Sequence, residues 1–138
     1  MSLQPSLPEV SLPEQAAASL KNRPFRDRLG FAMAGIWIVF AHERSFRTQC
    51  GLAAIALGTA AALRVDLLWA AFVALSIGMV LALEMVNAAL EYLIDRVHPE
   101  LAEEIGRAKD AAAGAVLIAT VATVVIAALM IADWLGVA

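Results

Sequence analysis

An uncharged stretch near the C-terminus, residues 111–132, restricts what this chain can fold into. At 1.5 Å per helical residue, it is long enough to cross a hydrocarbon core of about 30 Å. Two shorter uncharged stretches precede it, residues 50–63 and 67–83, and each reaches spanning length if its helix continues into the neighbouring polar residues. The chain is 62% hydrophobic, above the share of roughly half that is usual for soluble domains. We therefore expect an all-α membrane protein with three spans.

The remaining elements follow from the residues before these stretches. Residues 1–24 contain four prolines among Ser, Gln and Glu, which predicts a flexible N-terminal tail. From about residue 25 to 42, apolar residues recur at steps of three and four, which indicates an amphipathic helix lying on the membrane surface. The spans are expected at about residues 46–63, 67–95 and 105–132, with a tight turn between the first two.

The basic residues predict the orientation of these spans. Nine of the ten Lys and Arg residues fall on the side of the N-terminus and of the second connection, and Arg64 alone falls on the other. Because cytoplasmic flanks retain Lys and Arg, the N-terminus is expected in the cytoplasm. The net charge is -3 and no run of basic residues is interleaved with aromatics, so nucleic acid is not an expected partner.

The second span carries polar residues that are costly in lipid. Glu84, Asn87, Glu91 and Asp95 are spaced by three, four and four residues, which places them within an arc of roughly 80°. Such residues are usually kept for function or for pairing inside a bundle. Carboxylates and an amide suit a hard cation such as Mg²⁺, and the deepest carboxylate, Glu84, suits a base that takes a proton from a hydroxyl. A polar contact between helices of an oligomer is the structural alternative.

Two further clusters have open interpretations at this stage. Arg107 and Lys109 precede the third span, where they form either a positively charged corner for phosphate or ordinary cytoplasmic flanks. Glu43 either reaches toward the polar stripe or pairs with Arg47, four residues further on. The sequence has no Walker A loop, no kinase glycine-rich loop and no His-rich motif, so any nucleotide site must be built differently.

Three segments together resemble a known family. Residues 84–91, EMVNAALE, followed by Asp95, and residues 108–117, AKDAAAGAVL, closely resemble the signature of the prokaryotic diacylglycerol kinase family. Residues 42–47, HERSFR, extend the resemblance, which covers the chain from about Phe25 onward. It implies that residues 25–138 are an integral membrane kinase domain. It also implies a homotrimer whose active sites are shared between neighbouring protomers.

The resemblance implies a role for each matching residue. Glu84 would be the catalytic base acting on the lipid hydroxyl, with Asn87 beside it as an orienting residue. Glu43 and Glu91 would be ligands of the Mg²⁺ that accompanies the nucleotide. The other positions implied to contact ATP are Lys109, Asp110, Glu100 and Phe31, where phenylalanine replaces a tyrosine of the family.

The implied activity is phosphorylation of diacylglycerol to phosphatidic acid, by direct transfer from Mg-ATP at the cytoplasmic face of the bacterial inner membrane. Undecaprenol is the alternative lipid: residues 106–110 look like the diacylglycerol form, whereas residues 42–44 and 98–100 look more like the undecaprenol form. Pro24 stands where some members have an arginine that serves both substrates. A non-enzymatic membrane subunit or a cation pathway is the alternative from another class.

Overall fold

The computed structural model describes residues 24–97 and 103–137, and every regular element in these ranges is a helix. In chain order the helices are α2 (Phe25–His42), α3 (Arg44–Leu63), α4 (Leu67–Val97) and α5 (Glu103–Trp134). The last three are each long and apolar enough to cross a membrane. The all-α fold class and the three predicted spans are therefore confirmed. The predicted flexible tail, except Pro24, lies outside the described residues.

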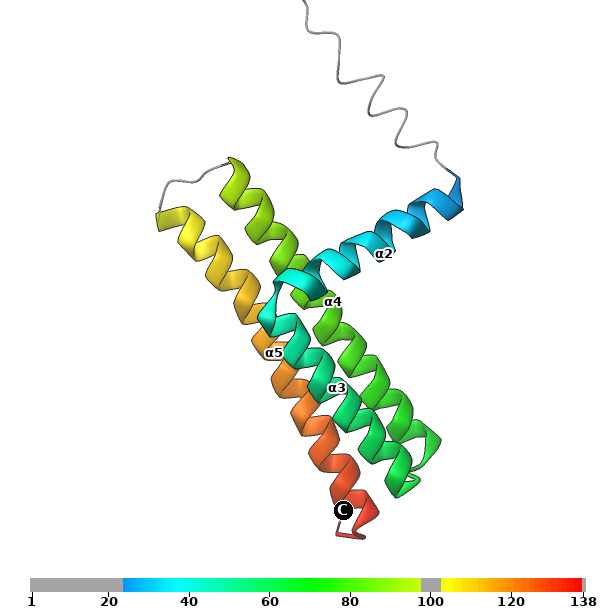
Figure 1. Ribbon diagram of the computed structural model, residues 1–138. Coiled ribbons are helices and arrows are strands. Elements are labelled where there is room, and N and C mark those ends of the chain that lie inside the picture. The colour runs from blue at the N-terminus through cyan, green and yellow to red at the C-terminus, as the bar shows by residue number, and fades with distance from the viewer. Residues whose placement is uncertain (1–23, 98–102, 138) are drawn as a thin grey trace, which may run out of the picture. The chain divides into compact units, whose positions relative to one another are not determined.

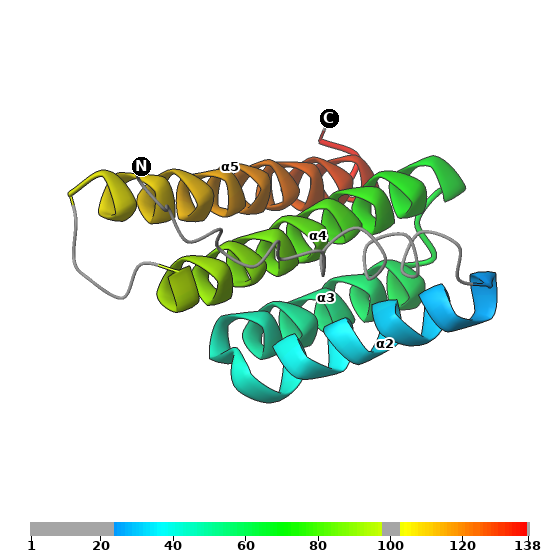
Figure 2. The ribbon, with the colours of Figure 1, turned by 90° about the horizontal axis from the view of Figure 1, so that it is seen from above.

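The chain divides into two compact units, Met1–Gly35 and Ile36–Ala138. The described part of the first unit is Pro24 with the beginning of α2, which starts with hydrogen bonds from Asp27 N and Arg28 N to Pro24 O. The second unit contains the end of α2 and the three long helices. In both views these long helices run alongside one another, and each reverses the direction of the one before (Figures 1 and 2).

The reversal between α3 and α4 takes three residues. Arg64 ends α3 in the left-handed conformation, with φ 52° and ψ 44°, which lets the backbone turn while Arg64 N and Val65 N still bond to the last carbonyls of α3. Asp66 then caps α4, because its Oδ1 accepts a hydrogen bond of 2.8 Å from Leu68 N. Two successive caps thus produce the tight turn expected for residues 64–66.

Helix α4 is the central element of the second unit. It packs against both α3 and α5, and Figure 2 shows it between them. Its buried residues Val73 and Ile77 meet Ala60 of α3 and Met130 of α5 in one apolar cluster. Small residues at the contact let neighbouring helices approach closely, as packing between helices in lipid requires.

A second apolar cluster lies where α2 ends and α3 begins. Val39 and Phe46 are buried there against Ala88 of α4. The break between α2 and α3 is Glu43, whose extended backbone (φ -94°, ψ 115°) redirects the chain. Arg47 secures the break by donating hydrogen bonds of 3.0 and 2.9 Å to the carbonyl oxygens of Phe40 and Ala41. Glu43 is thereby held beside the polar half of α4.

Candidate active site

Glu84 lies on α4 at the level of the apolar packing and is a buried charged residue, with 5% of its surface exposed. Gln49 of α3 reaches across to it, and Nε2 of this amide donates a hydrogen bond of 3.2 Å to Glu84 Oε2. Burial makes such a partner necessary, since a carboxylate without one pays the full cost of losing its water.

One turn further along α4, Asn87 and Glu91 form a pair. Asn87 Nδ2 donates a hydrogen bond of 2.9 Å to Glu91 Oε1, which fixes the carboxylate of Glu91 on the same helix face as Glu84. The amide oxygen of Asn87 is buried and has no partner among the described residues. A buried acceptor of this kind is one that an arriving donor or cation would satisfy.

Glu43 approaches the same part of α4. The hydroxyl of Tyr92, the residue after Glu91, donates a hydrogen bond of 2.6 Å to Glu43 Oε1. Glu43 thus contacts α4 at Tyr92, next in sequence to the stripe residue Glu91. Arg47 is occupied with carbonyl oxygens at the end of α2.

The cationic corner at the start of α5 also faces α4. Lys109 forms an ion pair with Asp95, the outermost residue of the stripe, and both side chains are partly or largely exposed. Arg107 pairs with Glu103 on its own helix, with Nη2 and Oε1 2.5 Å apart. Asp110 is exposed beside Lys109. Since Lys109 and Asp95 meet on the outside of the bundle, the ammonium group is accessible to a ligand from water.

Two further residues, Phe31 and Glu100, were predicted to contact ATP. Phe31 lies in the unit that ends at Gly35, where its side chain is 55% exposed. Pro24 is in the same unit and is exposed. Glu100 falls in the connection between α4 and α5, which is outside the described residues. The predicted contacts of Phe31 and Glu100 with ATP remain predictions.

Asn87 and Glu91 together have the oxygen donors of a partial magnesium site. Carboxylate and amide oxygens are hard donors, and Asn87 supplies a buried oxygen without a partner next to the Glu91 carboxylate. No group of three His, Cys, Asp or Glu side chains that would hold a metal alone occurs in residues 24–97 and 103–137. Magnesium that is shared with nucleotide phosphates needs only one or two carboxylates, and this arrangement fits that kind of site.

Two residues that contact carboxylates of the candidate site were not predicted from the sequence, Gln49 and Tyr92. Gln49 is the last polar residue before the apolar part of α3, and Tyr92 is the only tyrosine of the chain. Each touches a carboxylate that is 35 or 49 residues away in sequence. The available signal was modest: an amide at the edge of an uncharged stretch requires a partner once it is buried.

An all-helical chain with three potential spans and a carboxylate stripe at one end of them defines an integral membrane protein with a polar site. The family model described as prokaryotic diacylglycerol kinase matches residues 30–131. Over 97 residues the chain is 35% identical to a diacylglycerol kinase of Synechocystis sp., a match that covers 70% of this chain and 55% of that protein. The chain thus spans about half of the Synechocystis protein.

Two other relatives are covered more completely. The chain is 32% identical over 96 residues to a diacylglycerol kinase of Escherichia coli K12, covering 70% of this chain and 79% of that protein. It is 34% identical over 89 residues to a diacylglycerol kinase of Haemophilus influenzae, covering 64% of this chain and 75% of that protein. The chain belongs to the prokaryotic diacylglycerol kinase family. The predicted family and the predicted enzyme class are confirmed.

Proposed function

We propose that this protein transfers the γ-phosphoryl group of Mg-ATP to the hydroxyl of diacylglycerol, with Glu84 as the base. The observation that carries the proposal is the buried carboxylate of Glu84, which accepts a hydrogen bond from Gln49 of α3. Glu84 lies on α4, the helix that also carries the Asn87–Glu91 pair. Family membership supports the reaction type. The geometry supports the division of roles along α4.

The lengths of the helices support this division. The 31 residues of α4 extend about 46 Å, whereas the hydrocarbon core is about 30 Å thick. Counted from Leu67, roughly 20 residues cross that core, so Glu84 falls close to its inner boundary. The hydroxyl of a diacylglycerol lies at this boundary. Asp95 and Lys109 fall beyond it, where a nucleotide in water can reach them.

The residues divide the chemistry as follows. Glu84 takes the proton from the lipid hydroxyl while the oxygen of that hydroxyl bonds to the γ-phosphorus. The bond between the γ-phosphorus and the bridging oxygen breaks, and ADP leaves with its electron pair. Lys109 neutralises phosphate charge, and Asn87 keeps the Glu91 carboxylate oriented. No covalent intermediate on the protein is needed, so positioning and charge neutralisation provide the acceleration.

Magnesium has a defined place in this proposal. Glu91 and Glu43 would hold the ion, and Glu43 is bonded to Tyr92, the residue that follows Glu91. Bound there with the nucleotide, Mg²⁺ supplies charge neutralisation of the phosphate oxygens.

The test of the base is Glu84→Gln, which keeps the size of the side chain and removes its proton affinity. We expect turnover to fall about 100-fold or more while Mg-ATP binding is retained. Glu104→Gln is the matched control, because it makes the same change in an exposed residue at the start of α5. Turnover of Glu84→Gln equal to that of the wild-type protein would remove Glu84 from this role.

A direct comparison tests which of the two lipids is the substrate. Phosphate transfer from labelled ATP is measured with diacylglycerol and with undecaprenol in the same mixed micelles. We expect phosphatidic acid as the main product. Faster phosphorylation of undecaprenol would reassign the substrate and leave the roles of Glu84 and Glu91 unchanged.

We also propose that the protein is a homotrimer in the bacterial inner membrane, with its N-terminus in the cytoplasm. Only 11%, 17% and 11% of the apolar windows of α3, α4 and α5 are buried within one protomer, so most of their surface is available to lipid and to other protomers. Small residues at steps of four on α5, Ala111, Ala115 and Ala119, permit close helix packing. The mass of the protein in detergent, and labelling of single cysteines at each end, test both points.

A further inference from the structure

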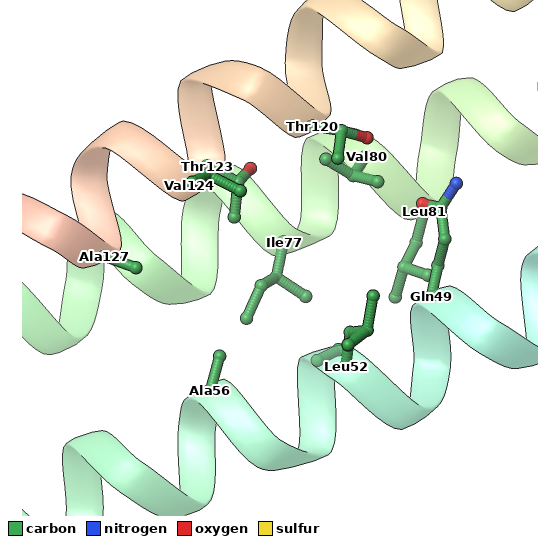
Figure 3. Close-up of a pocket in the computed structure, with 11 residues that line it drawn as sticks. Gln49, Leu52, Ala56, Ile77, Val80, Leu81, Thr120, Thr123, Val124 and Ala127 are labelled. Carbon is green, nitrogen blue, oxygen red and sulfur yellow. The ribbon is translucent and has the colours of Figure 1, made fainter.

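An apolar cavity of about 190 Å³ lies between α3, α4 and α5. Its lining is mainly aliphatic, from Ala127 at one end to Gln49 at the other (Figure 3). Two threonines also line it, but their hydroxyls donate to carbonyls of their own helix at 2.9 Å: Thr120 to Val116 and Thr123 to Ala119. Gln49 is the lining residue whose polar group reaches outside the cavity, to Glu84.

The two ends of the Gln49 amide have different surroundings. Nε2 donates to Glu84 Oε2 at 3.2 Å, while Oε1 is buried and has no partner among the described residues. Leaving a buried acceptor without a hydrogen bond costs stability, so the oxygen of this amide does not stabilise the fold. An aliphatic side chain would fill the same position at the cavity edge without that cost. The donor that Gln49 presents to Glu84 is therefore the feature that distinguishes it from an aliphatic residue.

We infer that Gln49 is a positioning residue for the catalytic carboxylate: its amide holds one oxygen of Glu84 and directs the other toward the lipid hydroxyl. The inference rests on the proposed function of Glu84. A glutamate side chain has three rotatable bonds, and a single bond to one oxygen restricts the carboxylate without consuming the oxygen that takes the proton.

The amide also suits the state that follows proton transfer. Once the other oxygen of Glu84 carries the proton, Oε2 is still an acceptor, and the Gln49 amide can keep its hydrogen bond to it. The donor of Gln49 can thus bond to Glu84 in both protonation states.

The test is Gln49→Met, which keeps the length and apolar volume of the side chain and removes its donor. We expect kcat for diacylglycerol to fall about 10- to 100-fold, as is typical when an outer partner of a functional group is lost, while the KM for Mg-ATP stays unchanged. The matched control is Thr120→Val, which removes a polar group from the same cavity that bonds only to its own helix. This control is expected to keep the wild-type kcat.

A double mutant separates positioning from general damage to the fold. In the Glu84→Gln background, Gln49→Met should lower the residual rate little or not at all, because the carboxylate that it positions is gone. An equal fold-loss in both backgrounds would show that Gln49 acts independently of Glu84 and would overturn the inference. If Gln49→Met does not fold, Gln49→Asn decides instead, since it stays polar and is one methylene too short to reach Glu84.

The outcomes distinguish this inference from the proposed function. If Glu84→Gln loses turnover but both Gln49 variants keep the wild-type kcat, Glu84 is the base and Gln49 does not position it. If Glu84→Gln keeps its turnover, or the wild-type protein forms no product, the proposed function falls and the inference falls with it.

Discussion

The hydrogen bond between Tyr92 and Glu43 gives a sharp prediction about metal binding. Tyr92→Phe removes one hydroxyl and leaves the ring in place. The hydroxyl is 2.6 Å from Glu43 Oε1, a distance typical of a bond assisted by charge. Without it, the Glu43 carboxylate is free to adopt other rotamers at the break between α2 and α3. We expect the variant to need more Mg²⁺.

The magnitude follows from the contact and its exposure. A hydrogen bond to a charged group contributes about 1.5 to 3 kcal/mol when it is protected from water. Tyr92 is 40% exposed, so water replaces part of the bond and about 1 kcal/mol is the reasonable figure. Since 1.4 kcal/mol is tenfold, the Mg²⁺ concentration at half-maximal activity should rise about fivefold.

The assay is a Mg²⁺ titration of phosphatidic acid formation at saturating ATP and lipid. Trp134→Phe is the matched control, because it also removes one hydrogen bond of an exposed aromatic residue, here a bond of 3.1 Å to Leu63 O at the opposite end of the bundle. An unchanged or lower Mg²⁺ requirement in Tyr92→Phe would refute the reasoning. It would mean that Glu43 holds no metal, or that its orientation does not depend on Tyr92.

Three further predictions concern other parts of the molecule. Glu91→Ala should raise the Mg²⁺ requirement more than Tyr92→Phe does, and an unchanged titration would count against Glu91 as a ligand. Lys109→Met should raise the KM for ATP about tenfold with a smaller effect on the KM for lipid, which steady-state kinetics with each substrate would detect. Trp69→Phe removes a bond of 2.8 Å to Asp133 at the far end of the bundle, and it should lower the free energy of unfolding by about 1 kcal/mol without changing kcat.

The helices of this protein could be predicted from the sequence because each depends on local information. Uncharged stretches define the spans, and one face of α4 carries the whole polar stripe. The ends are less well determined: α5 begins at Glu103 rather than near 105, since two glutamates in the first turn favour a helix start before the apolar residues begin. Likewise α3 begins at Arg44, directly after the extended Glu43, rather than near 46.

The contacts that arrange the site could not be predicted in the same way. Gln49 and Glu84 lie on different helices, and their meeting depends on how far α3 is rotated about its axis when it packs on α4. The reach of Glu43 toward α4 depends on the break after α2, which no periodic pattern specifies. Sequence patterns identify which residues share a face of one helix, whereas side chains from two helices meet through packing that only the fold determines.

Because α4 carries Glu84 and Glu91 on one continuous helix, their relative placement depends more on the angle between them about the helix axis than on the distance along it. The two residues are about 10 Å apart along the axis and only about 20° apart around it. One extra residue between them would lengthen the interval by about 1.5 Å but turn one carboxylate about 100° away from the other. Insertion of one residue into this interval should therefore abolish catalysis even though it adds little distance. Insertion of a full heptad should keep the two carboxylates on one face of the helix, but it would separate the lipid from the phosphate.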